Sequence, residues 1–304
     1  MEKQKTICKS VSITGRGLHS GKDVQVLFHP ASEDSGITFR RVDIPGCPTV
    51  RALVSRVHDT SRGTSLREGD ADVMTVEHLM AALAGLEIDN LRVDINDREL
   101  PIMDGSAQPY THLLQTAGIL EQNREKNYLV IDRDISFTLP EKEISLSISP
   151  YNGFKVEVEV DYGTSVLDKQ EAVMEDISEF IPHIHDARTF VFLHELLFLV
   201  NHGLVKGGDL DNAVVFVDKM PSREDLEQLA IFFNKKSIDI TSCGTLNHTP
   251  VRYPNEPAKH KLLDLVGDLY LLGRPIKGIV RAKKTGHWAN TEFGKKINEI
   301  YHLF

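Results

Sequence analysis

The sequence has few of the residues that define several specialised classes of protein. It contains three cysteines, Cys8, Cys47 and Cys243, which are odd in number, far apart and without a CxxC pair. This usage fits a reducing compartment and excludes a metal site built from cysteine. The amino terminus has no apolar segment behind its charges, and nowhere do about 18 apolar residues run together. We therefore expect a cytoplasmic protein with no transmembrane segment.

Positive charge is also scarce. The chain has 35 lysines and arginines against 44 acidic residues, which gives a net charge of -9. Nucleic-acid binders need clustered positive charge, so we expect no nucleic-acid partner, although local lysines and arginines can still bind an anionic small molecule. At 304 residues with 41% hydrophobic content, the chain is long enough for two cores.

The two halves of the chain show the same order of predicted elements. Alternating apolar and polar residues predict strands near 6–13, 23–28 and 36–41, and again at 128–131, 144–148 and 154–160. Each set precedes a helix and one more strand, at 76–86 and 88–95 and then at 259–273 and 276–282. We predict an α+β fold of two related domains, 1–124 and 128–304, with the active site at their interface. Residues 123–127 are the expected linker, and Thr75 is the expected cap of the first helix.

The predicted helix at 259–273 carries a polar stripe that a core would normally reject. His260, Asp264 and Asp268 are four residues apart, so their side chains point the same way, while leucines cover most of the remaining circumference. An imidazole and a carboxylate one turn apart can bind one cation, and the second carboxylate can hydrogen-bond a neighbour. Alternatively, the stripe pairs internally or with the adjacent lysines.

A second candidate lies far upstream, at Glu77 and His78. Adjacent helical residues point about 100° apart, which suits two roles: His78 binds a cation and Glu77 contacts its water. The alternative is an acid in a first helical turn, which the helix dipole favours. Combined with His260 and Asp264, His78 completes the two-histidine, one-carboxylate ligand set of zinc hydrolases, in which zinc lowers the pKa of water.

Two further histidines are candidates. His287 follows a basic turn at the entrance of the last predicted helix, and Asp268 is the natural partner to hold its imidazole charged. A charged histidine there could stabilise an oxyanion and protonate a leaving amine, although a surface histidine at a helix terminus is equally compatible. His19 lies in a glycine-framed turn, which is either a binding loop or an ordinary turn.

Six motifs resemble those of a known family: GRGLHSGK, VEHLMAALAGLEIDN, PIMDGSA, ARTF, KHKLLDLVGDLYLLG and KTGHWANT. The family is the UDP-3-O-acyl-N-acetylglucosamine deacetylases, the zinc amidases of lipid A biosynthesis, and the resemblance covers nearly the whole chain. It implies that Zn²⁺ is bound by His78, His260 and Asp264. It also implies that Glu77 is the general base and that His287, oriented by Asp268, is the cationic acid.

The resemblance further implies how a UDP-acyl-sugar substrate is held. Thr189 assists the oxyanion with Phe190 beside it, and Lys261 lies near the sugar. The remaining candidates are Lys284 and Asp161 for the nucleotide end, and His19. The implied fold is a sandwich of sheet, helix pair and sheet in each domain, with one small insert per domain.

The second insert, roughly 189–217, is implied to form a passage for the acyl chain. Its residues agree, because it is far more apolar than a surface excursion should be: Leu193, Leu196, Leu197, Phe198, Leu199 and Val200. Some members of the family continue into a fused dehydratase domain, which would lie beyond residue 304.

Two segments depart from the expected pattern. Asn247 to Ala258 is longer and richer in proline, and the segment around Arg62 and Gly63 is more polar. Two other functions remain open at this point. One is a zinc amidohydrolase acting on another N-acyl sugar. The other is a non-catalytic acyl-ligand-binding protein, which would need neither Glu77 nor His287.

Overall fold

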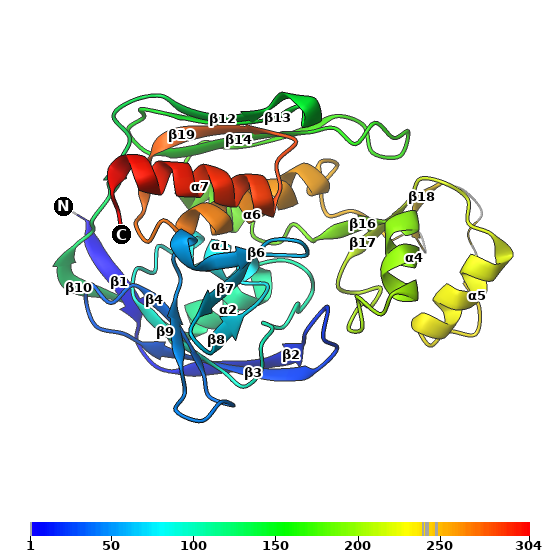
Figure 1. Cartoon of the computed structure of the whole chain (residues 1–304), viewed down its shortest axis with the longest axis horizontal. Helices are drawn as coiled ribbons and strands as arrows, with labels where there is room; N and C mark the ends of the chain where they lie inside the picture. Colours follow the sequence, from blue (N-terminus) through cyan, green and yellow to red (C-terminus); the bar gives the residue numbers. More distant parts are fainter. Residues whose placement is uncertain (1, 239, 241–242, 247–248) are drawn as a thin grey trace.

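The computed structural model describes residues 2–238, 240, 243–246 and 249–304, and each half of the chain supplies one large sheet (Figure 1). The strands of the first half are β1 (Lys3–Ile7), β2 (Val11–Arg16), β3 (Asp23–Pro30), β4 (Ile37–Arg41), β5 (Thr49–Arg51), β6 (Val57–Asp59), β7 (Ser65–Glu68), β8 (Ala71–Val73), β9 (Leu91–Ile95) and β10 (Ile119–Glu125). Its helices are α1 (Glu77–Gly85) and α2 (Gln108–Ala117).

The second half repeats this plan with a longer insert. Its strands are β11 (Leu129–Val130), β12 (Ile135–Leu139), β13 (Ile144–Ser149), β14 (Phe154–Val160), β15 (Gln170–Met174), β16 (Phe190–Phe192), β17 (Val214–Val217), β18 (Gly244–Thr245) and β19 (Ile276–Lys283). Its helices are α3 (Phe180–His183), α4 (Leu193–Asn201), α5 (Arg223–Phe232), α6 (Glu256–Tyr270) and α7 (His287–Tyr301).

The two large sheets have the same topology. The first has the order β2-β3-β9-β4-β5 and the second β12-β13-β19-β14-β15, with β11 added beside β19. In each, the central strand pairs antiparallel on one side and parallel on the other: β9 with β3 and β4, β19 with β13 and β14. The prediction of an α+β fold with two related halves is therefore confirmed.

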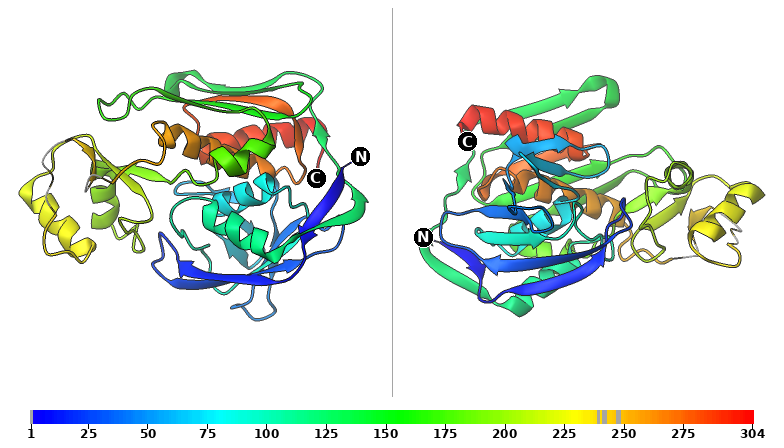
Figure 2. Two further views of the ribbon diagram at one scale, coloured as in Figure 1. Left: turned by 180° about the vertical axis from the view of Figure 1, so that it is seen from behind. Right: turned by 60° about the horizontal axis from the view of Figure 1, so that its bottom comes forward.

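The helices of both halves share the middle layer. α1, α2, α6 and α7 lie between the two large sheets, which form the outer layers (Figures 1 and 2). The strands alternate as predicted; in β14, for example, Val156, Val158 and Val160 are buried while the residues between them are partly exposed. One hydrophobic core joins the two halves, so the sandwich is built by both together.

Two inserts occupy equivalent places in the halves. The first is the small sheet β6-β7-β8 between β5 and α1, and the second contains β16, α4, β17 and α5 between β15 and α6. The second insert projects away from the sandwich and has its own apolar cluster, which includes Leu193, Leu196 and Val215 (Figure 1).

The structure corrects two local predictions. Residues 123–125 are not a linker, because β10 continues to Glu125 and pairs with β1. Thr75 does not cap α1: the residue before the helix is Val76, and the Thr75 hydroxyl is buried without a hydrogen-bond partner among the residues that the structure describes. Within the proline-rich stretch 247–258, residues 247 and 248 lie outside the described part of the chain.

None of the helices in the described ranges combines the length and apolar character that crossing a bilayer requires. The domain limits 1–124 and 128–304 stay a prediction.

Candidate metal centre and active site

The predicted polar stripe lies on α6, at the centre of the molecule. His260, Asp264 and Asp268 are each at most 2% exposed, because the other faces of α6 are leucine-rich and pack into the core on all sides. The first turn of α1 lies against this stripe and supplies Glu77 and His78, which are also buried. The structure therefore brings together two helices that are about 180 residues apart in the sequence.

Gly267 is what allows α6 and α1 to approach so closely. A Cβ atom at this position would lie 2.1 Å from the carbonyl oxygen of Glu77, far inside any tolerable contact. Only glycine fits at such a crossing, because it alone has no Cβ. Gly267, the point of close approach between α1 and α6, thus lies one helical turn after Asp264.

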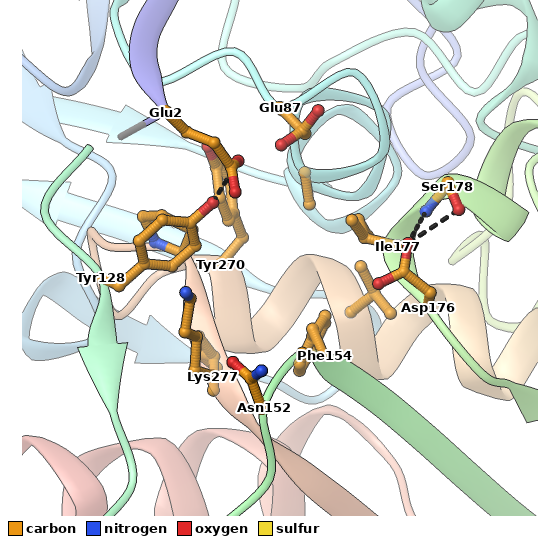
Figure 3. Close-up of a pocket in the computed structure, with 15 residues that line it drawn as sticks. Glu2, Glu87, Tyr128, Asn152, Phe154, Asp176, Ile177, Ser178, Tyr270 and Lys277 are labelled. Carbon is orange, nitrogen blue, oxygen red and sulfur yellow. Dashed lines mark hydrogen bonds between the residues drawn. The ribbon is translucent and has the colours of Figure 1, made fainter. Parts of the chain in front are cut away.

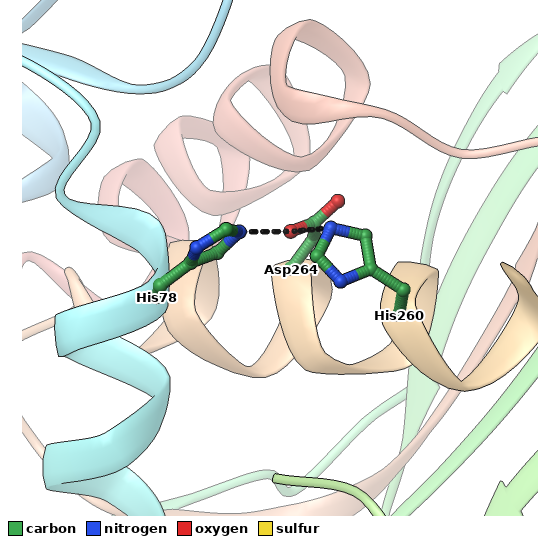
Figure 4. A group of neighbouring side chains, drawn as sticks. All are labelled: His78, His260 and Asp264. Carbon is green, nitrogen blue, oxygen red and sulfur yellow. Dashed lines mark ion pairs between the residues drawn. The ribbon is translucent and has the colours of Figure 1, made fainter. Parts of the chain in front are cut away.

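Three donor groups converge where the helices meet. One ligand atom from each of His78, His260 and Asp264 lies within 4.8 Å of the other two (Figure 4). Asp264 Oδ1 is 3.3 Å from His260 Nε2 and 3.7 Å from His78 Nε2. Two imidazole nitrogens and one carboxylate oxygen are a common ligand set for a divalent transition metal.

The protonation states of these groups suit a metal ion. Burial lowers the pKa of His78 to about 3, with further repulsion from His260, and burial likewise lowers the pKa of His260. Both imidazoles are therefore neutral at pH 7. His260 Nδ1 lies 3.0 Å from the Ala187 carbonyl oxygen, so Nδ1 carries the hydrogen and Nε2 keeps its lone pair for the site.

The side chain of Asp264 gives the most direct indication of a cation between the three donors. Burial would raise its pKa, but His260, Lys261 and His287 outweigh burial and keep it well below its usual range, so the carboxylate is ionised. Its Oδ2 accepts a hydrogen bond from Lys261, whereas Oδ1 is buried without a partner among the described residues. A buried anionic oxygen without a partner is costly, and a cation between Oδ1 and the two imidazoles would satisfy it.

Glu77 lies beside the three donors. Burial raises its pKa to about 7, although the charge of His287 opposes the shift. Its Oε2 accepts a hydrogen bond from the backbone N–H of Thr64, and Oε1 is 3.8 Å from His287 Nε2. A carboxylate with a pKa near 7 can take up and release a proton at neutral pH, as a general base must.

His287 is held as a cation on the other side. Burial lowers its pKa, but Asp268, Glu77 and Asp264 together outweigh burial and raise it to about 10. Asp268 Oδ2 is 3.0 Å from Nδ1 of the imidazole, which leaves the Nε2–H pointing into the site, 3.9 Å from Asp264 Oδ2. Asn290 fixes Asp268 in turn, by donating to the same Oδ2 atom at 2.8 Å.

The apolar insert opens a large cavity next to this centre. Its volume is about 700 Å³, and its wall includes Thr189, Phe190, Leu196, Phe198 and Val215. The Phe190 ring packs edge-on against His260, with centroids 6.4 Å apart, so one wall residue of the cavity contacts one of the three candidate donors.

The polar side of the cavity comes from the first half of the chain. His19, Ser61 and Arg62 contribute to its wall. The two ring nitrogens of His19 face the carbonyl oxygens of Leu204 and Arg62 at 3.1 and 2.9 Å, so this turn bridges the two inserts.

The remaining predicted substrate residues divide into two groups. Lys261 adjoins the site: its Nζ donates to Asp264 Oδ2 at 2.9 Å and lies 5.7 Å from the Phe190 ring centre. Lys284 and Asp161 lie together, with Nζ 3.8 Å from the carboxylate, and Glu143 also pairs with Lys284. No hydrogen bond or ion pair links these two to the donor cluster within the described residues.

A second cavity, of about 400 Å³, lies between the halves at the other end of α1 and α6 (Figure 3). Ala84 and Tyr270, from the last turns of these helices, line it together with Tyr128, Phe154 and Lys277. None of the predicted site residues is among the residues that line it.

Several residues of the centre were not predicted from the sequence. Thr64 contacts both Glu77, through its N–H, and Asp268, through its hydroxyl, and the Ala187 carbonyl orients His260. These groups act through backbone atoms or from loops, where no periodicity signals them. Asn290 lies three residues after His287, and this helical spacing is the one signal that could have indicated it.

The sequence is similar to a known family over nearly its whole length. Residues 4–241 and 233–299 match the family model described as UDP-3-O-acyl N-acetylglycosamine deacetylase, LpxC. A UDP-3-O-acyl-N-acetylglucosamine deacetylase from Teredinibacter turnerae is 42% identical over 300 residues, covering 98% of this chain and 90% of the relative. One from Coxiella burnetii is 38% identical over 300 residues, with the same coverage.

Longer relatives also match. The bifunctional enzyme LpxC/FabZ of Chlorobaculum tepidum is 42% identical over 302 residues, which are 97% of this chain. This chain spans 64% of the length of that relative, and 66% of the length of the bifunctional enzyme of Bacteroides thetaiotaomicron. Because the family model covers almost all of the sequence, and a relative of this name is 42% identical over 98% of this chain, the chain belongs to the UDP-3-O-acyl-N-acetylglucosamine deacetylase family.

Proposed function

We propose that the chain hydrolyses the acetamide of UDP-3-O-acyl-N-acetylglucosamine with a zinc ion, releasing acetate and the free amine in lipid A biosynthesis. One observation carries the proposal: His78, His260 and Asp264 face one point, with Glu77 and His287 directly beside it. A binding protein would need neither an acid of raised pKa nor a cationic histidine there. The names of the relatives from T. turnerae and C. burnetii support the substrate.

The roles of the residues follow from their atoms. A zinc ion held by the three donors would supply a Lewis acid that acidifies water and polarises a carbonyl oxygen. Glu77 would accept the proton of the attacking water on Oε1, the oxygen that faces the site. His287, whose Nδ1 is held by Asp268, would donate its Nε2 proton to the departing nitrogen. The Thr189 hydroxyl would assist the oxyanion at the mouth of the cavity.

The substrate would lie across the two halves. The cavity of about 700 Å³ suits an acyl chain, because its wall is mostly apolar. Phe190 and Lys261 would contact the sugar, and His19 would contact the substrate from the first half. We assign Lys284 and Asp161 to the nucleotide end.

The remaining parts of the proposal concern the protein as a whole. We propose the domains 1–124 and 128–304, a cytoplasmic location, which the sparse cysteines favour, and a fused second domain in the full-length protein. The bifunctional name and greater length of the C. tepidum relative support that last point.

The test compares turnover and metal content. Purified chain, supplied with zinc, is assayed for acetate release from UDP-3-O-acyl-N-acetylglucosamine. We expect Glu77→Gln to keep its zinc and lose activity by a factor of about 10²–10⁴, the usual contribution of a general base. His78→Ala should lose zinc and activity together, whereas His29→Ala, a histidine on strand β3 of the first large sheet, should lose neither.

Three outcomes would oppose the proposal. Unchanged turnover in Glu77→Gln would remove the base from the mechanism. Turnover of an N-acyl sugar without UDP at a higher kcat/KM would indicate another substrate. Tight substrate binding without any acetate release in the zinc-loaded wild type would indicate a binding protein.

A further inference from the structure

The loop that supplies the Ala187 carbonyl is fastened to α6 by a buried ion pair. Glu256, in the first turn of α6, is one turn before His260, and its side chain is 1% exposed. Arg188 directly follows Ala187, and its side chain is 12% exposed. The guanidinium donates from Nε and Nη2 to the two carboxylate oxygens of Glu256, at 2.9 and 3.1 Å, in the paired geometry that arginine forms best.

Two backbone groups reinforce the same carboxylate. The N–H of Arg188 donates to Glu256 Oε1 at 3.0 Å, and the N–H of Arg252 donates to Oε2 at 2.7 Å. Arg188 Nη2 also donates to the Pro250 carbonyl oxygen. Burial would raise the pKa of Glu256, but these donors outweigh it and lower the pKa. The carboxylate is therefore a charged anchor with four donors.

The residues on each side of Arg188 contact the site. Ala187 places its carbonyl oxygen 3.0 Å from Nδ1 of His260. Thr189 follows, its N–H bonded to the Gly105 carbonyl oxygen, and then Phe190 packs against the His260 ring. Because Arg188 is bonded to α6 through both its backbone and its side chain, the carbonyl of Ala187 has little freedom to move relative to His260.

We infer that the Arg188–Glu256 ion pair is a positioning pair for the metal ligand His260. It holds the Ala187 carbonyl against Nδ1, which fixes the tautomer and ring orientation that direct Nε2 into the donor cluster. It also fixes Thr189, the next residue, at the mouth of the cavity. The inference rests on the proposed metal site, but it concerns the geometry of a ligand and can be tested without substrate.

The test separates positioning from simple stabilisation. Arg188→Met and Glu256→Met each leave one buried charge unpaired and should lower the Tm, whereas the double variant removes both charges and should recover most of it. The zinc affinity, measured by competition with a chelator, should stay about 10- to 100-fold weaker in all three variants, because groups that orient a ligand have effects of that size. If the ion pair served only stability, the double variant would regain its zinc affinity together with its Tm. That result would overturn the inference.

A matched ion pair elsewhere serves as the control. Arg41 donates from Nε and Nη2 to Asp43 and from Nη1 to the Asp72 carbonyl, and its side chain is 9% exposed, which closely resembles Arg188. Arg41→Met should lower the Tm and leave the zinc affinity unchanged. An equal loss of zinc affinity in this variant would show that general destabilisation is sufficient and would contradict the inference.

Two conservative variants keep the test decisive if the methionine variants do not fold. Arg188→Lys and Glu256→Gln keep part of the hydrogen bonding, so the zinc affinity should fall by an intermediate factor, and the visible absorption spectrum of the Co²⁺-loaded protein should change. In activity assays of these variants, kcat should fall more than KM changes. Wild-type zinc affinity and an unchanged Co²⁺ spectrum in both would overturn the inference. A wild-type chain that binds zinc but does not deacetylate would sink the proposed function alone.

Discussion

Replacing Gly267 with alanine should separate the two halves of the metal site. The new Cβ would lie 2.1 Å from the Glu77 carbonyl oxygen and 3.1 Å from the Ala81 nitrogen, both backbone atoms that cannot rotate away. To restore an ordinary contact of 3.4 Å, the helices must move apart by about 1.3 Å. His78 is on one helix, and His260 and Asp264 are on the other.

A movement of this size is large compared with what zinc tolerates. Zinc–nitrogen bonds are about 2.0–2.1 Å long, and a working site holds them within about 0.2 Å. We therefore expect Gly267→Ala to weaken zinc binding by at least about 100-fold. Overpacking costs about 1–3 kcal/mol of folding free energy, whereas alanine in a helix gains about 0.5–1 kcal/mol over glycine, so the variant should also be less stable.

Gly294 provides the control for this prediction. It is also a buried glycine inside a helix, α7, but among the described residues a Cβ there would meet only the Val54 side chain, whose Cγ2 methyl at 3.1 Å can yield. Gly294→Ala should be neutral or slightly stabilising and should keep its zinc. The assay is chelator competition together with thermal unfolding of both variants. Wild-type zinc affinity in Gly267→Ala would refute the argument that this glycine sets the helix spacing.

Four further predictions concern the donors and the groups around them. Gly63→Ala would place a Cβ 2.7 Å from Glu77 Oε1, at a backbone φ of 137° that strains any residue with a side chain. Because the new Cβ would displace the Glu77 carboxylate, kcat should fall at least about tenfold while the zinc content is retained. An unaltered kcat would argue against this contact. The pH profile of kcat/KM should rise as Glu77 loses its proton, at or below about pH 7, and fall as His287 loses its own near pH 10. Asp268→Asn removes the anion that favours the imidazolium, so the alkaline limb should move to lower pH, and a limb that stays in place would exclude His287 as the acid. Removing zinc with a chelator should lower the Tm. Free zinc at about 1,000 times its Kd should then raise the free energy of unfolding by about 4 kcal/mol in the wild type and leave that of His78→Ala unchanged. An equal response of both proteins would place the ion elsewhere.

The sequence predicted the elements whose signals are periodic. The stripe on α6 was visible because His260, Asp264 and Asp268 share one face of an otherwise apolar helix, and the structure buries all three. The repeated order of strands and helices predicted two halves of one topology, and both sheets show it. A glycine also follows each of His78 and His260 after seven residues. The structure gives each a separate reason: Gly85 lies under the Phe180 ring, and Gly267 lies against α1.

Contacts made by loops and backbone groups could not be predicted in this way. The N–H of Thr64 and the carbonyl of Ala187 orient Glu77 and His260, but any residue type supplies those atoms. The error at 123–125 had a related cause: polar composition indicated a linker, whereas β1 supplied a partner strand from the other end of the half. A tertiary hydrogen-bond ladder thus outweighed local composition.

The central claim is that one metal ion joins α1 to α6 through three side chains. Anomalous diffraction at the zinc edge, from crystals of the zinc-loaded protein, tests this claim most directly. A single peak bonded to His78, His260 and Asp264, and absent from crystals of His78→Ala, is the predicted result. A peak that leaves out His78, or no peak at this position in the wild type, would contradict the account.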